Sequence, residues 1–357
     1  MSRNKSTVVQ IFQADGSTPV ETLDLTKLKN KLTFSDQLNG GLGELTLDLS
    51  YPFDDFSEGT RIKAMNIVDV YAVEDSYPLG RRVYRGFMSQ YEPYVLQNGA
   101  TGVLVRCLGL VSLAQYVYYK NGSSFAVTHT TADPQTMGRA IIDALNTSYN
   151  LFSYSNDTTD PTGGSLSKTF TDKKIFDALK ETQELTPDGW YWRIDANGVY
   201  WLKPKPVAAT HLFVLGRDIN WLRAPKSAEN IINDVQVRYS GGNADGSDAT
   251  SISAYGKRTQ ILMDTGLDSA AGAARNTKAL ADGKNMVIKA SLQLNDTYDI
   301  ESVHPGDTCQ VLNTAYGNAF FDTNMTIIQV QWEGETATLQ LGDYRADVAV
   351  EVARMVG

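Results

Sequence analysis

The stretch Glu44-Leu45-Thr46-Leu47-Asp48-Leu49 alternates strictly between polar and apolar residues. Successive side chains of a β-strand point to opposite faces of the sheet, so the three leucines share one face. Antiparallel sheets commonly bury one face and leave the other in solvent, which produces this alternation. The stretch therefore predicts a β-strand, and similar segments flank it.

The sequence around this stretch consists of short strand-forming segments separated by turns. Further strands are predicted at 8–12, 62–72, 83–88 and 103–109. Turn-forming residues lie at 14–17 and 56–60, and Asn98-Gly99 is a strong hairpin signal. About six short strands without a long helix are typical of a small antiparallel barrel or sandwich. We expect residues 1–112 to form a first β-barrel.

The segment 113–205 mixes helices and strands. Asp133 is a good N-cap and Pro134 a good first helical residue. The apolar residues that follow recur every four positions, at Met137, Ile141 and Leu145. A second helix is expected to begin at a Thr171 cap, and an aromatic hairpin follows at 190–202. This pattern predicts a small α+β middle domain.

Residues 206–345 are rich in predicted strands again. These lie at 231–239, 288–294, 308–312, 325–330 and 336–341. Between them, a helix of small residues is expected from Ser269 to about Asp282, with Asp268 as its N-cap and Gly283 as its C-cap. We expect a second β-barrel with a helix-containing insertion at about 250–300, followed by a C-terminal tail at 346–357.

One sequence pattern occurs in both strand-rich parts. A glycine turn starts a strand, a hairpin follows, and a last strand ends at Leu-Gly. The first copy runs from Ser57 to Gly109 and the second from His304 to Gly342. The predicted fold class is therefore β-rich α+β, with two similar antiparallel β-barrels, an intervening small α+β domain and a helical insertion.

Composition limits the classes of function. The chain has 357 residues and a net charge of −9. It is therefore a poor candidate for binding nucleic acid, because affinity for the phosphates comes from Lys and Arg. An acidic surface fits DNA that slides past without sticking. Cys107 and Cys309 lie in apolar runs and are interpreted as buried free thiols. Met1–Val9 carries no apolar signal region. The sequence contains no run of about 18 apolar residues, so no membrane span is predicted.

The titratable residues show no catalytic or metal-binding pattern. Asp54-Asp55 lie next to each other on a turn, and a glycosidase needs two carboxylates across a cleft. Asp299 and Glu301 lie two positions apart and would share one face of a strand, and no functional role is expected for them. The three histidines fall in separate segments, without the clustered ligands of a zinc site: His129, His211 and His304. We expect no catalytic residue, no metal, no cofactor and no enzyme activity.

The aromatic hairpin is the strongest candidate for a contact site. Trp190, Trp192 and Ile194 share one strand face, and Trp201 or Tyr200 lies on the facing strand. Exposed rings of this kind stack on sugars, so Trp190, Trp192 and Trp201 are candidate glycan or partner contacts. The alternative is a hydrophobic face that packs on the two preceding helices, and this is the favoured interpretation.

The order of these motifs resembles the tail hub, or baseplate hub, family of tailed phages. The resemblance covers nearly the whole chain. The segments that carry it are Leu45–Leu49, Phe56–Ile62, Tyr84–Phe87, Val105–Gly109, Gly189–Gly198, Glu229–Val237, Ser253–Arg258 and Val303–Asp307.

The resemblance implies a structural virion protein at the tail tip, assembled in the host cytoplasm. It implies a homotrimer whose two barrels per chain form a pseudo-sixfold ring. Such hubs join the tail tube or distal tail protein to a tip, fibre or spike protein, and DNA passes through them without specific binding. A receptor- or carbohydrate-binding tail protein using the hairpin 190–202 is the alternative function, and a cell-wall hydrolase is a third hypothesis.

Overall fold

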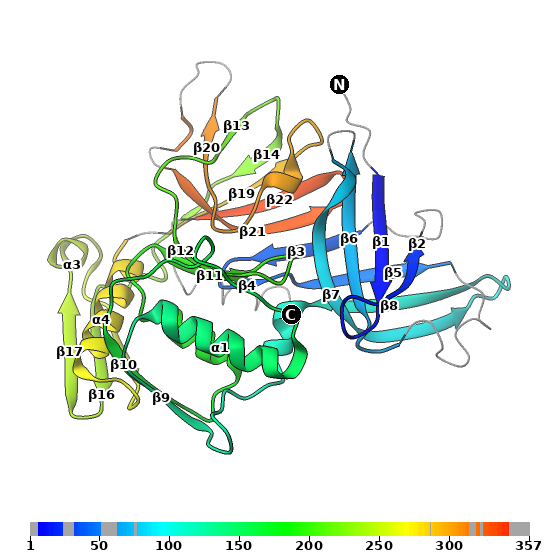
Figure 1. Ribbon diagram of the computed structural model, residues 1–357. Helices are drawn as coiled ribbons and strands as arrows, with labels where there is room; N and C mark the ends of the chain where they lie inside the picture. The colour runs from blue at the N-terminus through cyan, green and yellow to red at the C-terminus, as the bar shows by residue number, and fades with distance from the viewer. Residues whose placement is uncertain are drawn as a thin grey trace.

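The computed structural model describes residues 6–23, 32–50, 63–74, 77–285, 287–313, 319–321 and 324–342. It is a β-rich α+β fold with two strongly curled sheets and few helices (Figure 1). The predicted turn at 56–60, the Asp54-Asp55 pair and the tail at 346–357 lie outside the described residues.

The first curled sheet has six strands in the order β2-β1-β6-β7-β8-β5, all antiparallel. The strands are β1 (Ser6–Phe12), β2 (Pro19–Leu23), β5 (Glu44–Leu49), β6 (Ile67–Glu74), β7 (Tyr77–Val95) and β8 (Thr101–Gly109). Leu45, Leu47 and Leu49 are buried, as their alternation predicts. The hairpin at Asn98-Gly99 is also confirmed, because it joins β7 to β8.

The second curled sheet follows the order β13-β20-β21-β22-β19-β14, and β3 and β15 pair with it from the side. Its strands are β3 (Thr33–Gln37), β13 (His211–Val214), β14 (Ile219–Arg223), β15 (Lys226–Ser227), β19 (Val287–Leu294), β20 (Thr308–Leu312), β21 (Met325–Glu333) and β22 (Thr336–Gly342). Only β13 and β20 pair in parallel among the described strands of this sheet. Strand β3 comes from the N-terminal part of the chain and pairs with β21.

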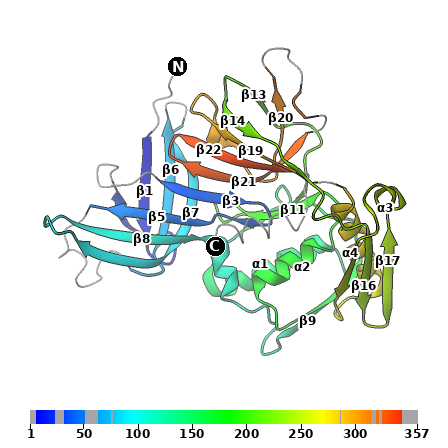
Figure 2. The same ribbon diagram turned by 180° about the vertical axis from the view of Figure 1, so that it is seen from behind.

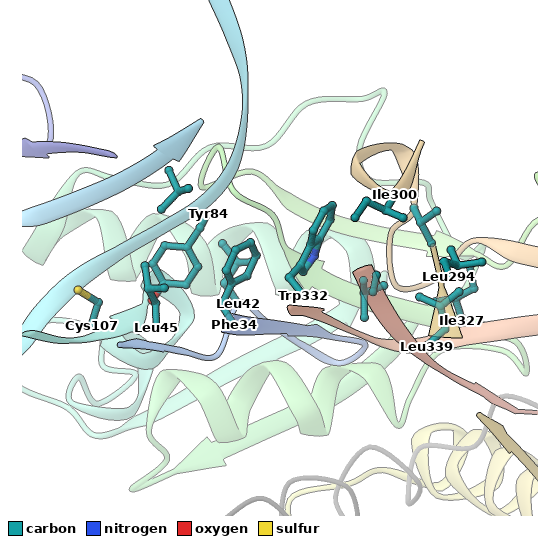
Figure 3. Close-up of a cluster of buried hydrophobic side chains, with 14 of the residues drawn as sticks. Phe34, Leu42, Leu45, Tyr84, Cys107, Leu294, Ile300, Ile327, Trp332 and Leu339 are labelled. Atoms are coloured by element: carbon teal, nitrogen blue, oxygen red, sulfur yellow. The ribbon is translucent and has the colours of Figure 1, made fainter. Parts of the chain in front are cut away.

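This crossing strand gives the two sheets a common hydrophobic core. Phe34 on β3 lies 5.1 Å from the ring of Tyr84 in the first sheet and 5.7 Å from the ring of Trp332 in the second. Figure 3 shows the side chains as one series from Cys107 and Tyr84, through Phe34, to Trp332 and on to Ile327 and Leu339. The two sheets are therefore packed as one body.

The middle of the chain, joined by β4 from the N-terminal part, forms a second core beneath these sheets. It contains β4 (Gly40–Gly41), η3 (Leu110–Gln115), β9 (Ala126–Ala132), α1 (Pro134–Tyr149), β10 (Leu166–Thr171), α2 (Ile175–Gln183), β11 (Trp190–Ile194) and β12 (Tyr200–Pro204). The predicted start of α1 is confirmed, since the Asp133 carboxylate accepts a hydrogen bond from the Gln135 amide. Thr171 as the cap of α2 is wrong: it is the last residue of β10, and the N-cap is Lys174.

A third unit lies at the edge of the molecule, where Figures 1 and 2 label β16 and β17. It consists of β16 (Asp234–Tyr239), β17 (Gly242–Ser247), α3 (Ala249–Tyr255), β18 (Thr259–Met263) and α4 (Ser269–Gly283). We expected 229–237 to belong to the second barrel, but β16 lies in a sheet separate from the second curled sheet. Strand β16 pairs with β17 and β18, because Val235 and Val237 are buried in a separate cluster that includes Ala271 of α4.

Helix α4 shows why a glycine signal can mislead. The predicted Asp268 cap is confirmed, since its carboxylate accepts a hydrogen bond from the Ala271 amide. Gly283 is not the C-cap but the last helical residue. A Cβ atom at this position would lie 2.5 Å from the carbonyl oxygen of Ile232, so the close approach of the backbone explains the glycine.

Candidate functional site: the junction beneath the two curled sheets

The aromatic hairpin β11–β12 lies where the N-terminal segment, the helices and the second sheet meet. Strand β4 pairs in parallel with β11, through Arg193↔Gly40 and Ile194↔Gly41. Gly41 has a φ of 159°, and a Cβ there would lie 2.5 Å from the Ile194 carbonyl oxygen. On the next strand, Tyr200 and Leu202 are buried in the core of the helical part.

The hairpin does not present its three tryptophans on one surface. Trp192 is fully buried, and its ring packs edge-to-face on Phe176 with the centroids 5.7 Å apart. Trp190 is half-buried against the same core. Trp201 pairs with Arg193 across the hairpin and so lies on the opposite face from Trp192. The favoured interpretation of Trp192 as a core residue is confirmed.

Trp201 belongs to a polar cluster on that opposite face. Its Nε1 donates a hydrogen bond of 2.9 Å to the Asp195 carboxylate. The Arg193 guanidinium lies 5.2 Å from the Trp201 ring centroid and 3.7 Å from the Asp36 carboxylate of β3. Arg193 and Asp36 are 7 % and 6 % exposed, so the charged groups of the junction are enclosed.

The environment of Asp36 favours its protonated form. Burial raises the pKa of Asp36 to about 7, and the Arg193 charge opposes this rise only in part. The carboxylates of Asp195 and Asp307 raise the pKa further. An Asp36 oxygen and two Arg193 nitrogens have no hydrogen-bond partner among the residues that the structure describes. The Asp36–Arg193 pair therefore lacks part of its hydrogen bonding. Buried polar atoms without a partner lower the stability of the fold.

Two of the three histidines meet at Asp307, which the sequence did not predict. The Asp307 carboxylate lies 3.1 Å from His211 Nε2 and accepts a 2.9 Å hydrogen bond from the His304 amide. His211 Nδ1 lies 3.0 Å from the Tyr298 hydroxyl. Burial, followed by the Arg193 charge, lowers the pKa of His304 to about 4. His211 lies 87 positions from Tyr298 and 96 from Asp307, so no local spacing in the sequence signals this cluster.

The remaining histidine and the other carboxylate candidates lie elsewhere. His129 lies on β9, and its Nε2 is 2.8 Å from the Tyr119 hydroxyl. Asp299 is 3.5 Å from Arg81. The expectation that Asp299 and Glu301 share a strand face is wrong, because Glu301 is a buried residue of the 3-10 helix η4 (Ile300–Ser302) and Asp299 is the N-cap of that helix. Within the described residues, no three His, Cys, Asp or Glu side chains gather in a way that would hold a metal ion.

Both cysteines are buried free thiols, as predicted. Burial raises the pKa of Cys107 and of Cys309, which disfavours the reactive thiolate. Within the part of the chain that the structure describes, none of the helices has the length and hydropathy needed to cross a lipid bilayer.

A second charged cluster joins the third unit to the middle of the chain. Lys168 of β10 is 2 % exposed and contacts Asp264 at 2.5 Å and Glu181 of α2 at 2.9 Å. Arg275 of α4 contacts Asp264 at 2.9 Å and Glu184 at 2.6 Å. These contacts involve β10, the end of α2 and α4, so they fix the third unit on the helical part.

No protein-family model matches the sequence, and no curated protein matches it. Solved structures do match along nearly the whole chain. The prophage MuSo2 43 kDa tail protein from Shewanella oneidensis aligns with a TM-score of 0.62 at 14 % identity, covering 96 % of this chain and 99 % of that one. The chain has the fold of phage tail proteins.

Two further structures widen this comparison. Prophage tail protein gp18 from Listeria monocytogenes EGD-e aligns with a TM-score of 0.61 at 10 % identity, covering 98 % of both chains. The E. coli c3393 protein, a component of the type VI secretion system with structural similarity to T4 tail proteins gp27 and gp5, aligns with a TM-score of 0.51 at 10 % identity. That match covers 87 % of this chain and 72 % of the other. The tail-protein fold thus includes both curled sheets and the parts between them.

Proposed function

We propose that this chain is a structural protein of a phage tail tip and forms a homotrimeric hub. The observation that carries the proposal is the tail-protein fold, which extends over 96 % and 98 % of this chain in the two prophage comparisons. The role is assembly rather than catalysis, and it requires no cofactor.

The pairing of two curled sheets in one chain supports threefold assembly. Three copies related by a threefold axis contain six such sheets, and a closed ring forms from head-to-tail contacts. A ring of three chains mimics sixfold symmetry only if the two sheets of each chain belong to two similar barrels, and we propose that they do. The proposed division is 1–112, 113–205 and 206–345, with the tail at 346–357, and the third unit of β16, β17, α3, β18 and α4 is an insertion within 206–345.

The shared core makes each pair of sheets a rigid element of the ring. Phe34 packs against aromatic rings of both sheets, so the angle between them does not depend on a linker. A ring of fixed geometry is suited to dock on a sixfold tail tube or distal tail protein on one side. On its other side it would hold a tip, fibre or spike protein.

The net charge of −9 suits a passage for DNA. Nonspecific DNA affinity comes from Lys and Arg contacts to phosphates, so a predominantly acidic ring lets DNA pass without holding it. The proposed location is the virion tail tip, with assembly in the host cytoplasm.

The location is tested by immunogold labelling of phage particles with antibodies to this chain, combined with its deletion from the phage genome. We expect label at the distal end of the tail and a deletion phenotype of particles without a functional tail tip. Label along the tail tube or on the capsid would contradict the proposal.

A further inference from the structure

The hairpin that joins β7 to β8 carries an exposed apolar tip. Figures 1 and 2 both show this hairpin projecting beyond the rest of the first sheet. Val95 at the end of β7 is 58 % exposed, and Leu96 in the turn is 51 % exposed. The sequence from Pro93 to Val105 contains no Asp, Glu, Lys or Arg, although 20 % of the chain is charged. Exposed apolar residues that gather in this way are typical of a protein–protein contact.

The turn at the tip is held in one shape by its own hydrogen bonds. The Leu96 amide donates to the Ala100 carbonyl at 2.8 Å, and the Gly99 amide donates to the Leu96 carbonyl at 2.9 Å. The Ala100 amide in turn donates to the Asn98 side-chain oxygen at 3.1 Å. Because the tip is already ordered, it loses little conformational entropy when it binds a partner.

A second exposed apolar patch lies on the second sheet, along β13 and β20. Val207 precedes β13 and is 94 % exposed, and Leu212 lies on β13 and is 49 % exposed. Phe320 hydrogen-bonds to β20 through its backbone amide and is also 49 % exposed. Neither 206–216 nor 308–313 contains Asp, Glu, Lys or Arg. These three exposed residues are called the second-sheet patch below.

The hairpin tip and the second-sheet patch cannot meet within one chain. Figures 1 and 2 both place the body of the first sheet between the hairpin tip and strands β13 and β20. The shared core around Phe34 packs the two sheets as one body, so no linker can bring the two surfaces together. They can meet only between copies, in a head-to-tail contact of the kind that closes a ring.

The charge of the chain favours a contact between copies at these two surfaces. Two copies with a net charge of −9 each repel one another overall. The cores of protein interfaces are correspondingly depleted of charged residues and enriched in apolar and aromatic ones. The hairpin tip and the second-sheet patch both have this composition. One chain therefore supplies both halves of an uncharged contact, and a second copy is the partner that fits.

We propose that the hairpin tip of one copy, residues 95–101, packs against the second-sheet patch of the next copy. This inference rests on the proposed homotrimeric hub and names the two surfaces that form its interface. Each chain gives its hairpin to one neighbour and receives the hairpin of the other, so three contacts close the ring. The first sheet of each chain then lies beside the second sheet of the next, which is the alternation that a pseudo-sixfold ring requires.

A charge placed in the hairpin tip of the full chain tests this contact. Leu96→Glu should raise the concentration at which the trimer dissociates by at least about tenfold, measured by analytical ultracentrifugation. Ile261→Glu is the matched control, because Ile261 is also 51 % exposed but lies on β18, and it should leave the trimer unchanged. Circular dichroism of both variants should match that of the wild type, since both positions are exposed.

A charge placed in the second-sheet patch tests the other half of the contact. Val207→Glu should weaken the trimer as Leu96→Glu does, and the two changes together should weaken it further through like-charge repulsion. Val207→Lys should restore association in the Leu96→Glu chain, because the two charges are then opposite. If Val207→Lys restores no more association than the same change at Ile261, the second-sheet patch does not receive the hairpin.

Cysteine cross-linking reports the contact independently of its affinity. Leu96→Cys is combined in turn with Val207→Cys, Leu212→Cys and Phe320→Cys, and the two native cysteines are buried and do not compete. We expect at least one pair to give covalent dimers and trimers on a denaturing gel without reductant, whereas Leu96→Cys alone should give monomers. Dimers from Leu96→Cys alone would show a tip-to-tip contact and would overturn the proposal, as would the absence of cross-links with all three partners.

The outcomes separate this contact from the hub that it would close. A wild-type trimer that is unaffected by Leu96→Glu and by Val207→Glu keeps the hub and refutes the hairpin contact. A wild-type chain that stays monomeric at every concentration refutes both. Variants that form the trimer normally but fail to enter phage tails would show that the hairpin tip binds another virion protein, which also refutes the contact between copies.

Discussion

Phe34→Ala is the change that best tests how the two curled sheets are joined. Phe34 is 4 % exposed, and its ring contacts Tyr84 on one side and Trp332 on the other. Truncation of a buried phenylalanine typically costs about 3–5 kcal/mol, which includes the cavity that remains. A native protein is usually stable by only about 5–15 kcal/mol, so the loss is a large share of the total.

We expect Phe34→Ala to lower the free energy of unfolding by about 3–5 kcal/mol, measured by guanidinium denaturation with tryptophan fluorescence. A cycle with Trp332→Ala should give a coupling of about 0.5–3 kcal/mol, because the two rings are in contact. Phe125→Ala is the control, since Phe125 is 45 % exposed, and its loss should stay near or below about 1 kcal/mol.

We also expect the cooperativity of unfolding to change. With the contact across the sheets removed, the two sheets should unfold less cooperatively, so the denaturant slope should fall in Phe34→Ala. If Phe34→Ala costs no more than Phe125→Ala and leaves the slope unchanged, then Phe34 does not join the two sheets.

Three further predictions concern charged groups. Burial raises the pKa of Asp36 to about 7, so the folded state binds the carboxyl proton of Asp36 more tightly than the unfolded state does. Protonation of Asp36 therefore stabilises the folded state. This contribution is complete below about pH 4 and should be lost as the pH rises through 7. Urea titrations at pH 5 and pH 8 should show this loss in the wild type and a smaller one in Asp36→Asn; equal losses would contradict it. Asp69 is fully buried between Arg82 at 3.0 Å and Arg85 at 3.3 Å. Asp69→Ala should lower the free energy of unfolding by about 3–5 kcal/mol, because it leaves buried arginine charge uncompensated. A decrease of less than about 1 kcal/mol in thermal or chemical unfolding would count against this ion pair. Asp268→Ala removes the N-cap of α4 and should cost about 0.5–2 kcal/mol, whereas Asp268→Asn, which keeps a capping oxygen, should cost less; equal losses would argue against capping.

Local signals in the sequence predicted individual elements well. The alternation at Leu45, Leu47 and Leu49 identified a strand that is buried on that face. The cap residues Asp133 and Asp268 located the starts of two helices. These signals are reliable because the interactions form within a few residues of one another.

The sequence could not predict contacts between distant segments. Strand β3 lies in the N-terminal part of the chain, between strands of the first sheet in sequence, and pairs with β21, nearly three hundred positions further along the chain. The Asp36, Arg193 and Asp307 cluster likewise combines a strand, a hairpin and a loop. Each partner looks like an ordinary surface charge in its own segment, and only the fold brings them together. Gly283 shows the same limit, because its neighbour Ile232 lies on another segment.

Single-particle electron microscopy of the purified chain is the most direct test of the proposed hub. We expect a ring with threefold symmetry, a mass about three times 39.2 kDa, and six similar curled sheets around a central opening. Particles that contain a single chain at every protein concentration, or a ring in which the two sheets of each chain do not occupy equivalent positions, would contradict it.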